Sequence, residues 1–374
     1  MRVKKILPHF FIAIVAITAM GCKRSPALAT KEQRTEQTAE AGISQITTNI
    51  FGALINETDG VQFTPAQKVV LVKDSLKCKY ARMNIALSTF SGTANLYDAY
   101  ANAGIKVVLN ISNKPTGSQQ PFPTDTVAFK TKLSSVLAVY QPEVLVIENE
   151  EVNQNYHSGP LSDYFNELKA AINVAHSQST PIKVTNGGIV CRMATLITWK
   201  SYIDSGLVNK AKNYAAKAFP ADKLDANGNP DLTKGGYQAM LDTGLVLINK
   251  YKQLPLDYVN FHWYEPVAMR AMPSEQGGLD TISHIDATTL GSTIRCLRNK
   301  TGKEVITNEI GQLNLQPGIT TDIMSKVKAM SVPYVLWYSG GDGIIGDAIP
   351  LQNGNGTLRN TGKAFRNFII TNYP

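Results

Sequence analysis

Two stretches of the sequence end an apolar run in an Asn-Glu pair. The first is PEVLVIENEE (residues 142–151) and the second is EVITNEIGQ (residues 304–312), which places Glu309 159 positions after Glu150 (309 minus 150). Runs of β-branched residues that stop at polar residues are typical of buried parallel strands whose carboxyl ends open into a site. Glycoside hydrolysis needs two carboxyl groups, one as proton donor and one as nucleophile or base. The two pairs therefore favour this chemistry.

The first stretch holds three glutamates for one proton-donating role. By strand alternation Glu148 and Glu150 point the same way, so Glu148 is either a second site residue or the register differs by one. Glu150 is the preferred candidate because Asn149 precedes it. On its own, a strand ending in carboxylates is more often a strand that runs into an acidic turn. The second Asn-Glu stretch favours the functional interpretation.

Strand and helix patterns alternate along the chain. Eight strands are predicted, each followed by a helix, at residues 46–54, 80–87, 105–111, 144–147, 182–189, 258–263, 304–312 and 334–338. Eight such repeats in about 330 residues predict an α/β fold of the (β/α)8 TIM-barrel type. No Gly-rich dinucleotide fingerprint follows the first strand, which disfavours an open doubly wound sheet.

In such a barrel the carboxyl ends of all strands point to one face, so polar residues at those ends converge. The residues at the predicted strand ends are Asn56, Glu57, Arg82, Asn110, Asn149, Glu150, Asn186, His262, Tyr264, Glu309 and Trp337. An arginine would keep a nucleophilic carboxylate charged, a tyrosine hydroxyl would orient it, and an indole would offer a flat face to a sugar. Arg82, His262 and Trp337 also have a structural alternative, as ion-pair or core residues of the barrel.

These motifs resemble the 4/7 superfamily of retaining glycoside hydrolases, also called clan A. Its members place an Asn-Glu pair at the end of strand four and a glutamate at the end of strand seven. The pair at Asn149 and Glu150 matches the first motif, NEIG (residues 308–311) resembles the second, and DYVNFHWY (residues 257–264) is similar to strand six of the family. Glu151 departs from the pattern, because many members have proline there.

The resemblance implies a role for each matched residue. Glu150 would be the general acid/base and Glu309 the nucleophile of a double displacement. The implied substrate-binding residues are Asn149, which would hold the sugar 2-hydroxyl, Arg82, His262, Tyr264 and Trp337, the last as the floor of the sugar site. Asn186, at the end of the fifth predicted strand, is a further substrate-binding candidate.

The predicted function is hydrolysis of O-glycosidic bonds in an oligo- or polysaccharide with retention of configuration. Neither a metal nor an organic cofactor is needed for that chemistry. An alternative is a non-catalytic glycan-binding lipoprotein on the same barrel, which a displaced or salt-bridged Glu309 would favour. A carbohydrate lyase or esterase is a third possibility, although no GxSxG elbow supports an esterase.

The first residues predict export and anchoring. A basic start precedes an apolar run at residues 6–20 that is too short to span a bilayer comfortably, which indicates a signal peptide over residues 1–21. AMGC (residues 19–22) resembles a bacterial lipobox and implies lipidation of Cys22, the alternative being an ordinary signal peptide cut nearby. Residues 22–42 are predicted to be the lipidated cysteine and a flexible tether, and residues 43–374 a catalytic domain. We therefore expect a monomeric, lipid-anchored protein of the cell envelope, in the periplasm or on the outer-membrane surface.

Composition narrows the class of partner. The formal charge of +8 becomes +5 without the three basic residues of the signal (8 minus 3), and no Lys/Arg run occurs, so nucleic acid is not an expected partner. Lipidation of Cys22 would leave Cys78, Cys191 and Cys296. Three widely spaced cysteines indicate neither a disulfide framework nor a zinc site, although one pair could bridge.

Overall fold

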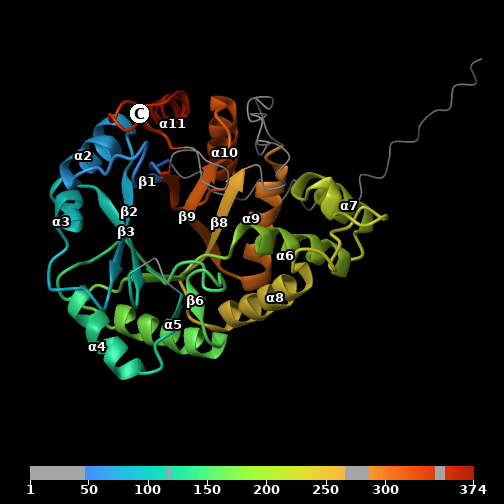
Figure 1. Cartoon of the computed structure of the whole chain (residues 1–374), viewed down its shortest axis with the longest axis horizontal. Coiled ribbons are helices and arrows are strands. Elements are labelled where there is room, and N and C mark those ends of the chain that lie inside the picture. The colour runs from blue at the N-terminus through green and yellow to red at the C-terminus, as the bar shows by residue number, and fades with distance from the viewer. Residues whose placement is uncertain (1–46, 116–118, 266–285, 342–349) are drawn as a thin grey trace, which may run out of the picture. The chain divides into compact units, whose positions relative to one another are not determined.

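Eight parallel strands alternate with helices and form the (β/α)8 barrel that the sequence predicts (Figure 1). The computed structural model describes residues 47–374 except 116–118, 266–285 and 342–349, so the predicted signal, Cys22 and the tether lie outside the described residues. The strands lie side by side in the order β7, β5, β3, β2, β1, β10, β9 and β8. All their carboxyl ends therefore meet at one face of the barrel.

The strands are short apolar runs, which suits burial on both faces. Their bounds are β1 (Phe51–Ile55), β2 (Tyr80–Ala86), β3 (Lys106–Ser112), β5 (Val144–Ile147), β7 (Lys183–Asn186), β8 (Tyr258–Glu265), β9 (Glu304–Gln312) and β10 (Val335–Ser339). Val108, Val144, Val146, Ile306 and Leu336 belong to one buried cluster contributed by β3, β5, β9 and β10. Packing between these strands fills the barrel interior with side chains, so the site can lie only at its rim.

Local signals set the helix starts. Thr64 and Gln67 form a capping box before α2, with Pro65 as the first helical residue, and Asp125 caps α4. The helices are α2 (Pro65–Val69), the π-helical turn η1 (Val70–Ser75), α3 (Asn95–Asn102), α4 (Thr126–Leu137), α5 (Leu161–His176), α6 (Cys191–Asp204), α7 (Val208–Ala218), the 3-10 turn η2 (Ala221–Lys223), α8 (Tyr237–Gln253), α9 (Thr288–Thr301), α10 (Pro317–Ala329) and α11 (Asn360–Asn372). Helix α7 is an addition that the sequence pattern does not predict.

The barrel closes between β7 and β8 without a continuous backbone ladder. One bridge joins Ile189 to Phe261, with the Ile189 N–H donating to the Asn260 carbonyl at 3.0 Å and the His262 N–H donating to the Ile189 carbonyl at 2.9 Å. The Asn186 side chain supplies further contacts, since its Nδ2 donates to the Asn260 carbonyl at 3.0 Å and its Oδ1 accepts from the Asn260 N–H at 2.7 Å. A side-chain amide thus takes the place of a peptide group in this seam.

Two further features bear on the predictions about membrane and redox state. Within the described residues, no helix has both the length and the apolar character that crossing a bilayer requires. Cys78, Cys191 and Cys296 are all free thiols. Burial raises the pKa of the Cys296 thiol, which makes it a poor nucleophile at neutral pH.

Candidate active site

The chain leaves β5 in a way that separates Glu148 from Glu150. The strand ends at Ile147, and both glutamates have left-handed backbone conformations, with φ of 63° and 47°. Strand alternation therefore stops before Glu148, and the prediction that the two side chains point the same way is wrong. The Glu148 side chain is buried against Glu167 of α5 and accepts from the Asn113 N–H at 2.9 Å. Glu148 is thus not part of the site, and Glu150 is.

Glu150 is held by contacts from three parts of the chain. Its Oε1 lies 3.0 Å from Nδ1 of His262, and its Oε2 accepts from Nδ2 of Asn153 at 2.7 Å. The preceding carbonyl, that of Asn149, accepts from Nε2 of His157 at 2.8 Å. His157 lies in a short strand, β6 (His157–Ser158), which pairs with β4 (Gln120–Pro121) and ties the loops after β3 and β5 together. Asn153 has no signature in the sequence beyond its place in the same loop.

A β-bulge in β9 orients the side chain of Glu309 toward the site. Ile306 pairs with Asn260 of β8, but Glu309 pairs with His262, so β9 contains one extra residue at this point. A bulge of this kind turns two consecutive side chains toward the same side of the strand. Asn308 and Glu309 both face the site, where the Asn308 amide contacts His262 and the Glu309 carboxylate contacts Arg82.

Glu309 is a buried carboxylate with its charge stabilised. Arg82 Nη1 donates to its Oε2 at 2.5 Å, and the Tyr264 hydroxyl donates to its Oε1 at 2.5 Å. Burial alone would raise the pKa of Glu309, but the charges of His262 and Arg82 and the hydrogen bonds from Tyr264 and Arg82 outweigh it and lower that pKa to about 2. Glu309 is therefore an anion at any pH near neutrality.

The contact between Arg82 and Glu309 leads to a prediction about stability that can be tested without a substrate. Arg82→Met removes the cation that contacts Oε2 of the buried Glu309 carboxylate, so we expect the free energy of unfolding to fall by about 3–5 kcal/mol. The same substitution in a Glu309→Gln background should cost less, because no unpaired charge remains. Denaturant unfolding of the four proteins measures both costs. Equal costs in the two backgrounds would show that the ion pair contributes nothing beyond the other Arg82 contacts, which are to Asn149 and the Asn308 carbonyl.

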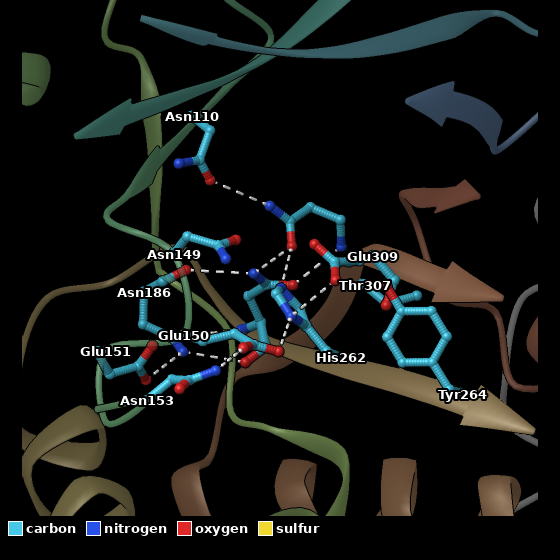
Figure 2. Close-up of polar contacts among 12 residues, drawn as sticks. Asn110, Asn149, Glu150, Glu151, Asn153, Asn186, His262, Tyr264, Thr307 and Glu309 are labelled. Carbon is cyan, nitrogen blue, oxygen red and sulfur yellow. Dashed lines mark hydrogen bonds and ion pairs between the residues drawn. The ribbon is translucent and has the colours of Figure 1, made fainter. Parts of the chain in front are cut away.

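His262 lies between the two carboxylates (Figure 2). Its Nε2 is 2.9 Å from Oδ1 of Asn308, an oxygen that also accepts from Asn260 Nδ2 at 2.6 Å, so the network assigns a proton to Nε2. Nδ1 then shares one proton with Glu150. Burial opposes a charge on this imidazole, but the Glu309 and Glu150 carboxylates outweigh burial and raise the pKa of His262 above its ordinary value.

The proton between Glu150 and His262 leads to a prediction of how kcat/KM changes at alkaline pH. The raised pKa of His262 means that the imidazole keeps the proton on Nδ1, beside Glu150, at pH values below that raised pKa and loses it as the pH rises through it. With Glu150 as the general acid that the sequence predicts, kcat/KM should fall about tenfold per pH unit above that point. An NMR titration of the His262 ring should give the same midpoint as the kinetics. A titration midpoint for His262 below about 6.5 would contradict this assignment.

A control for that titration is His176. It lies at the end of α5, partly exposed, and pairs with Asp257 at 2.9 Å. His176→Gln should leave the alkaline limb where it is. A shifted limb in this variant would show that the limb does not belong to the Glu150–His262 pair.

Gly188 allows the backbone to approach His262. Its φ is 124°, and a Cβ atom built there would lie 2.2 Å from Nε2 of the imidazole. Any larger residue at this position would displace the ring, so Gly188 is needed for its placement. The sequence shows the glycine at the end of the fifth predicted strand, but only the fold shows what lies against it.

Trp337 is not at the site, which corrects the prediction that it forms a floor for the sugar. Its side chain is fully buried and packs edge-on against Phe365 of α11, with ring centroids 5.5 Å apart. Leu336 points into the barrel interior, so alternation along β10 turns Trp337 outward. The next inward residue is Tyr338, whose ring centroid lies 6.2 Å from that of Tyr264. The predicted register is thus off by one.

Asn186 is also used inside the protein. It is fully buried, and beside its contacts to Asn260 it donates to the Glu151 carboxylate at 3.0 Å. These bonds occupy its amide, so the structure assigns Asn186 to the barrel seam and corrects the prediction that it binds substrate. Asn110 has a similar supporting place, since its Oδ1 accepts from Asn308 Nδ2 at 3.4 Å (Figure 2).

Of the predicted site residues, the structure brings six together at the rim, namely Arg82, Asn149, Glu150, His262, Tyr264 and Glu309. Glu150, His262 and Glu309 each offer one ligand atom, and these atoms lie within 4.8 Å of one another. A divalent cation there would lie beside the Arg82 guanidinium, which already neutralises Glu309. The positive charge of Arg82 therefore makes binding of a metal ion by these three side chains unfavourable.

No protein-family model matches the sequence, and no curated protein is similar to it in sequence. Solved structures do match the fold. A glucosidase from Croceicoccus marinus is 10% identical, with a TM-score of 0.57 over 88% of this chain and 69% of that one. A β-xylosidase from Caulobacter crescentus is 12% identical, with a TM-score of 0.52 over 86% and 68%. A GH5-4 endoglucanase from Clostridium acetobutylicum is 14% identical, with a TM-score of 0.50 over 86% and 96%. At these identities the likeness establishes the barrel fold, which these glycosidases share.

Proposed function

We propose that the protein is a retaining glycoside hydrolase. The observation that carries the proposal is the spacing of its two carboxyl groups, since one oxygen of Glu150 and one of Glu309 lie within 4.8 Å of each other. Retaining enzymes hold the two carboxyl groups about 5–5.5 Å apart, whereas inverting enzymes need about 6.5–9.5 Å to fit a water. An approach this close between single oxygens of the two groups favours the shorter spacing of retaining enzymes.

The different environments of Glu309 and Glu150 suit the two carboxyl groups to different roles. Glu309, ionised and oriented by Arg82 and Tyr264, attacks the anomeric carbon and forms a glycosyl-enzyme. Glu150, which shares a proton with His262, gives that proton to the departing oxygen. In the second step Glu150 takes a proton from water, and the resulting hydroxyl displaces Glu309. The chain then returns to its starting state without a cofactor.

A glycan-binding protein without turnover is the second candidate. The Arg82–Glu309 ion pair is the feature that this alternative leads one to expect. The ion pair occupies Oε2, while Oε1 faces Tyr264 and His262, and Glu150 remains beside it. A salt-bridged but correctly placed nucleophile fits an enzyme as well as a binding protein, so turnover has to decide.

The deciding experiment is hydrolysis of a panel of aryl and alkyl β-glycosides and oligosaccharides by residues 43–374. NMR of the first-formed sugar reports its anomeric configuration before mutarotation. We expect turnover with retention. A product of inverted configuration would refute the double displacement, and binding without turnover on every substrate would favour the glycan-binding protein.

The cell-envelope location is a separate proposal. We propose that Cys22 carries the lipid and that residues 22–42 tether the barrel, because AMGC resembles a lipobox. Expression of the full chain and of Cys22→Ser, followed by separation of membrane and soluble fractions, tests this. The anchor is disproved if the variant stays with the membrane to the same extent.

A further inference from the structure

The face of the barrel opposite the site is strongly positive. We define this amino face as the first residue of each barrel strand, the connection leading to it and the last turn of the helix before that connection. It carries twelve basic and four acidic side chains, a net charge of +8 (12 minus 4). The basic residues are Lys73, Lys77, Lys79, Lys106, Lys183, Lys250, Lys252, Arg298, Lys300, Lys303, Lys326 and Lys328, and the acidic residues are Asp74, Glu143, Asp257 and Glu304.

The rest of the domain has the opposite charge. Residues 43–374 carry a formal charge of +4, which is the +8 of the chain without the seven basic and three acidic residues of the first 42 (8 minus 7 plus 3). A charge of +8 on the amino face therefore leaves −4 for all other residues of the domain (4 minus 8). Lysines in the last turns of helices stabilise the helix dipole, but this reason does not apply to Lys79, Lys106, Lys183 and Lys303, which lie at strand starts.

Three tyrosines close the barrel on the amino face and hold lysines there. Tyr334 packs edge-on against Tyr80 and Tyr258, with ring centroids 5.2 and 5.6 Å apart. The Lys183 ammonium lies 5.6 Å from the centroid of the Tyr258 ring, and the Lys79 ammonium lies 5.5 Å from that of Tyr80. An aromatic ring attracts a cation placed over its face. These contacts bring basic side chains from different strands to the centre of the amino face.

The remaining basic residues surround this centre. Lys77 and Lys252 are exposed, and the Lys106 side chain is 49% exposed although it pairs with Glu143. The charges come from the starts of β2, β3, β7 and β9 and from the ends of η1, α8, α9 and α10, so they are spread around the barrel. A nucleic-acid strand is typically held by a charged groove that follows its backbone. A distribution around a whole face instead suits a plane of anionic headgroups.

The chain enters the barrel from the same face. The described residues begin with Thr47 and lead into β1, and Asn49 Nδ2 donates to the Lys77 carbonyl at 2.9 Å. The predicted tether, residues 22–42, is therefore joined through residues 43–46 to the amino face and not to the rim. A lipid on Cys22 would tie this face to a bilayer.

We propose that the amino face docks on the surface of an anionic phospholipid bilayer, with the site turned away from the membrane. The proposal rests on the cell-envelope location proposed above and goes beyond the glycosidase function. Each basic residue close to such a surface raises the affinity about fivefold. A site turned away from the membrane meets glycans that are dissolved or that stand above the bilayer, and not the headgroups of the leaflet that anchors the protein.

Vesicle binding tests the amino face without the lipid. The protein is the mature chain with Cys22→Ser, expressed without its signal peptide. The probes are vesicles of phosphatidylcholine and of an equimolar mixture of phosphatidylcholine and phosphatidylglycerol. We expect binding to the mixed vesicles that weakens as salt is added, and none to the neutral ones. Equal binding to the two kinds of vesicle, or none to either at low salt, would overturn the proposal.

A triple variant locates the binding surface. It combines Lys77→Glu, Lys183→Glu and Lys252→Glu, three exposed positions of the amino face where folding is not at risk. Its affinity for the mixed vesicles should be at least tenfold lower than that of the parent chain, because each change removes an attraction and adds a repulsion. Thermal unfolding of both proteins checks that the fold is retained.

The control makes the same change in net charge elsewhere. Lys132→Glu, Lys169→Glu and Lys363→Glu alter exposed positions of α4, α5 and α11 that lie outside the amino face. This variant should keep most of the binding. An equal loss in the two triple variants would show that net charge matters and the amino face does not, which would refute the proposal.

Soluble anionic polymers separate a bilayer from another acidic partner. Duplex DNA and heparin should bind more weakly than the mixed vesicles at the same salt concentration, and tighter binding of either polymer would overturn the proposal. None of these measurements uses turnover or the lipid. Their outcome is therefore independent of the glycosidase assay and of the Cys22→Ser fractionation.

Discussion

Glu309→Gln is expected to lower kcat by on the order of 10⁴-fold or more on any glycoside that the wild type hydrolyses. The amide has nearly the same shape but cannot bond to the anomeric carbon as a carboxylate does, so the covalent step is lost. Folding should survive, because the single amide oxygen can still accept one of the two hydrogen bonds that Glu309 receives from Arg82 and Tyr264. Initial rates with an activated aryl glycoside, alongside thermal unfolding, measure both effects.

The matched control for this loss is Glu304→Gln. Glu304 begins the same strand, has a side chain that is 60% exposed and pairs with Arg298 at the surface, where an ion pair contributes little. A smaller variant, Glu309→Gly, adds a chemical test, since azide can enter the vacated space and attack the anomeric carbon. The glycosyl azide formed should have the inverted configuration. Retained activity in Glu309→Gln would exclude Glu309 as the nucleophile.

Glu150→Gln is expected to show the second largest effect, a loss of about 10²–10⁴-fold that depends on the leaving group. A poorly acidic alcohol needs the proton of Glu150 in order to leave, so alkyl glycosides should suffer most. A nitrophenolate leaves without help, so its glycoside should suffer least in the first step and should accumulate as glycosyl-enzyme. Rates across phenols of graded acidity give this slope, which should be steeper in the variant than in the wild type.

Glu148→Gln is the informative comparison for Glu150→Gln. Burial raises the pKa of Glu148 to about 7, so its carboxyl group is partly protonated near neutrality and an amide is a fair substitute. The Glu148 side chain faces α5 and not the rim, so turnover and its dependence on the leaving group should be kept. If Glu148→Gln instead reproduced the Glu150→Gln profile, the assignment of the proton donor would be wrong.

The sequence predicts the barrel and most of the rim because both follow from simple periodicities. Alternating strands and helices predict the fold, and polar residues at strand ends meet whenever parallel strands close into a barrel. Arg82, Glu150 and Glu309 are examples, each carried to the rim by a different strand. Their catalytic and binding roles remain predictions that the experiments above address.

The sequence does not reveal the places where the backbone departs from strand geometry. Left-handed residues after Ile147 turn Glu148 away from Glu150, and the extra residue in β9 turns Asn308 and Glu309 to one side. Neither feature has a glycine or proline to mark it. The prediction that Trp337 forms the floor of the sugar site is wrong for another reason. A one-residue change of register exchanges the two faces of a strand. The exchange leaves the pattern of apolar residues in β10 nearly unchanged.

The seam between β7 and β8, which Asn186 and Asn260 bridge, determines where the barrel opens most easily. Elsewhere a strand is released only when a row of peptide hydrogen bonds breaks together, but here a few bonds around Asn186 and Ile189 hold the two edges. Local fluctuations should therefore begin at this join, and the peptide hydrogens of Asn260 and His262 should exchange with solvent faster than those of β2. The same fluctuation would loosen the wall between His262 and the start of α6, which gives a bulky product a way out.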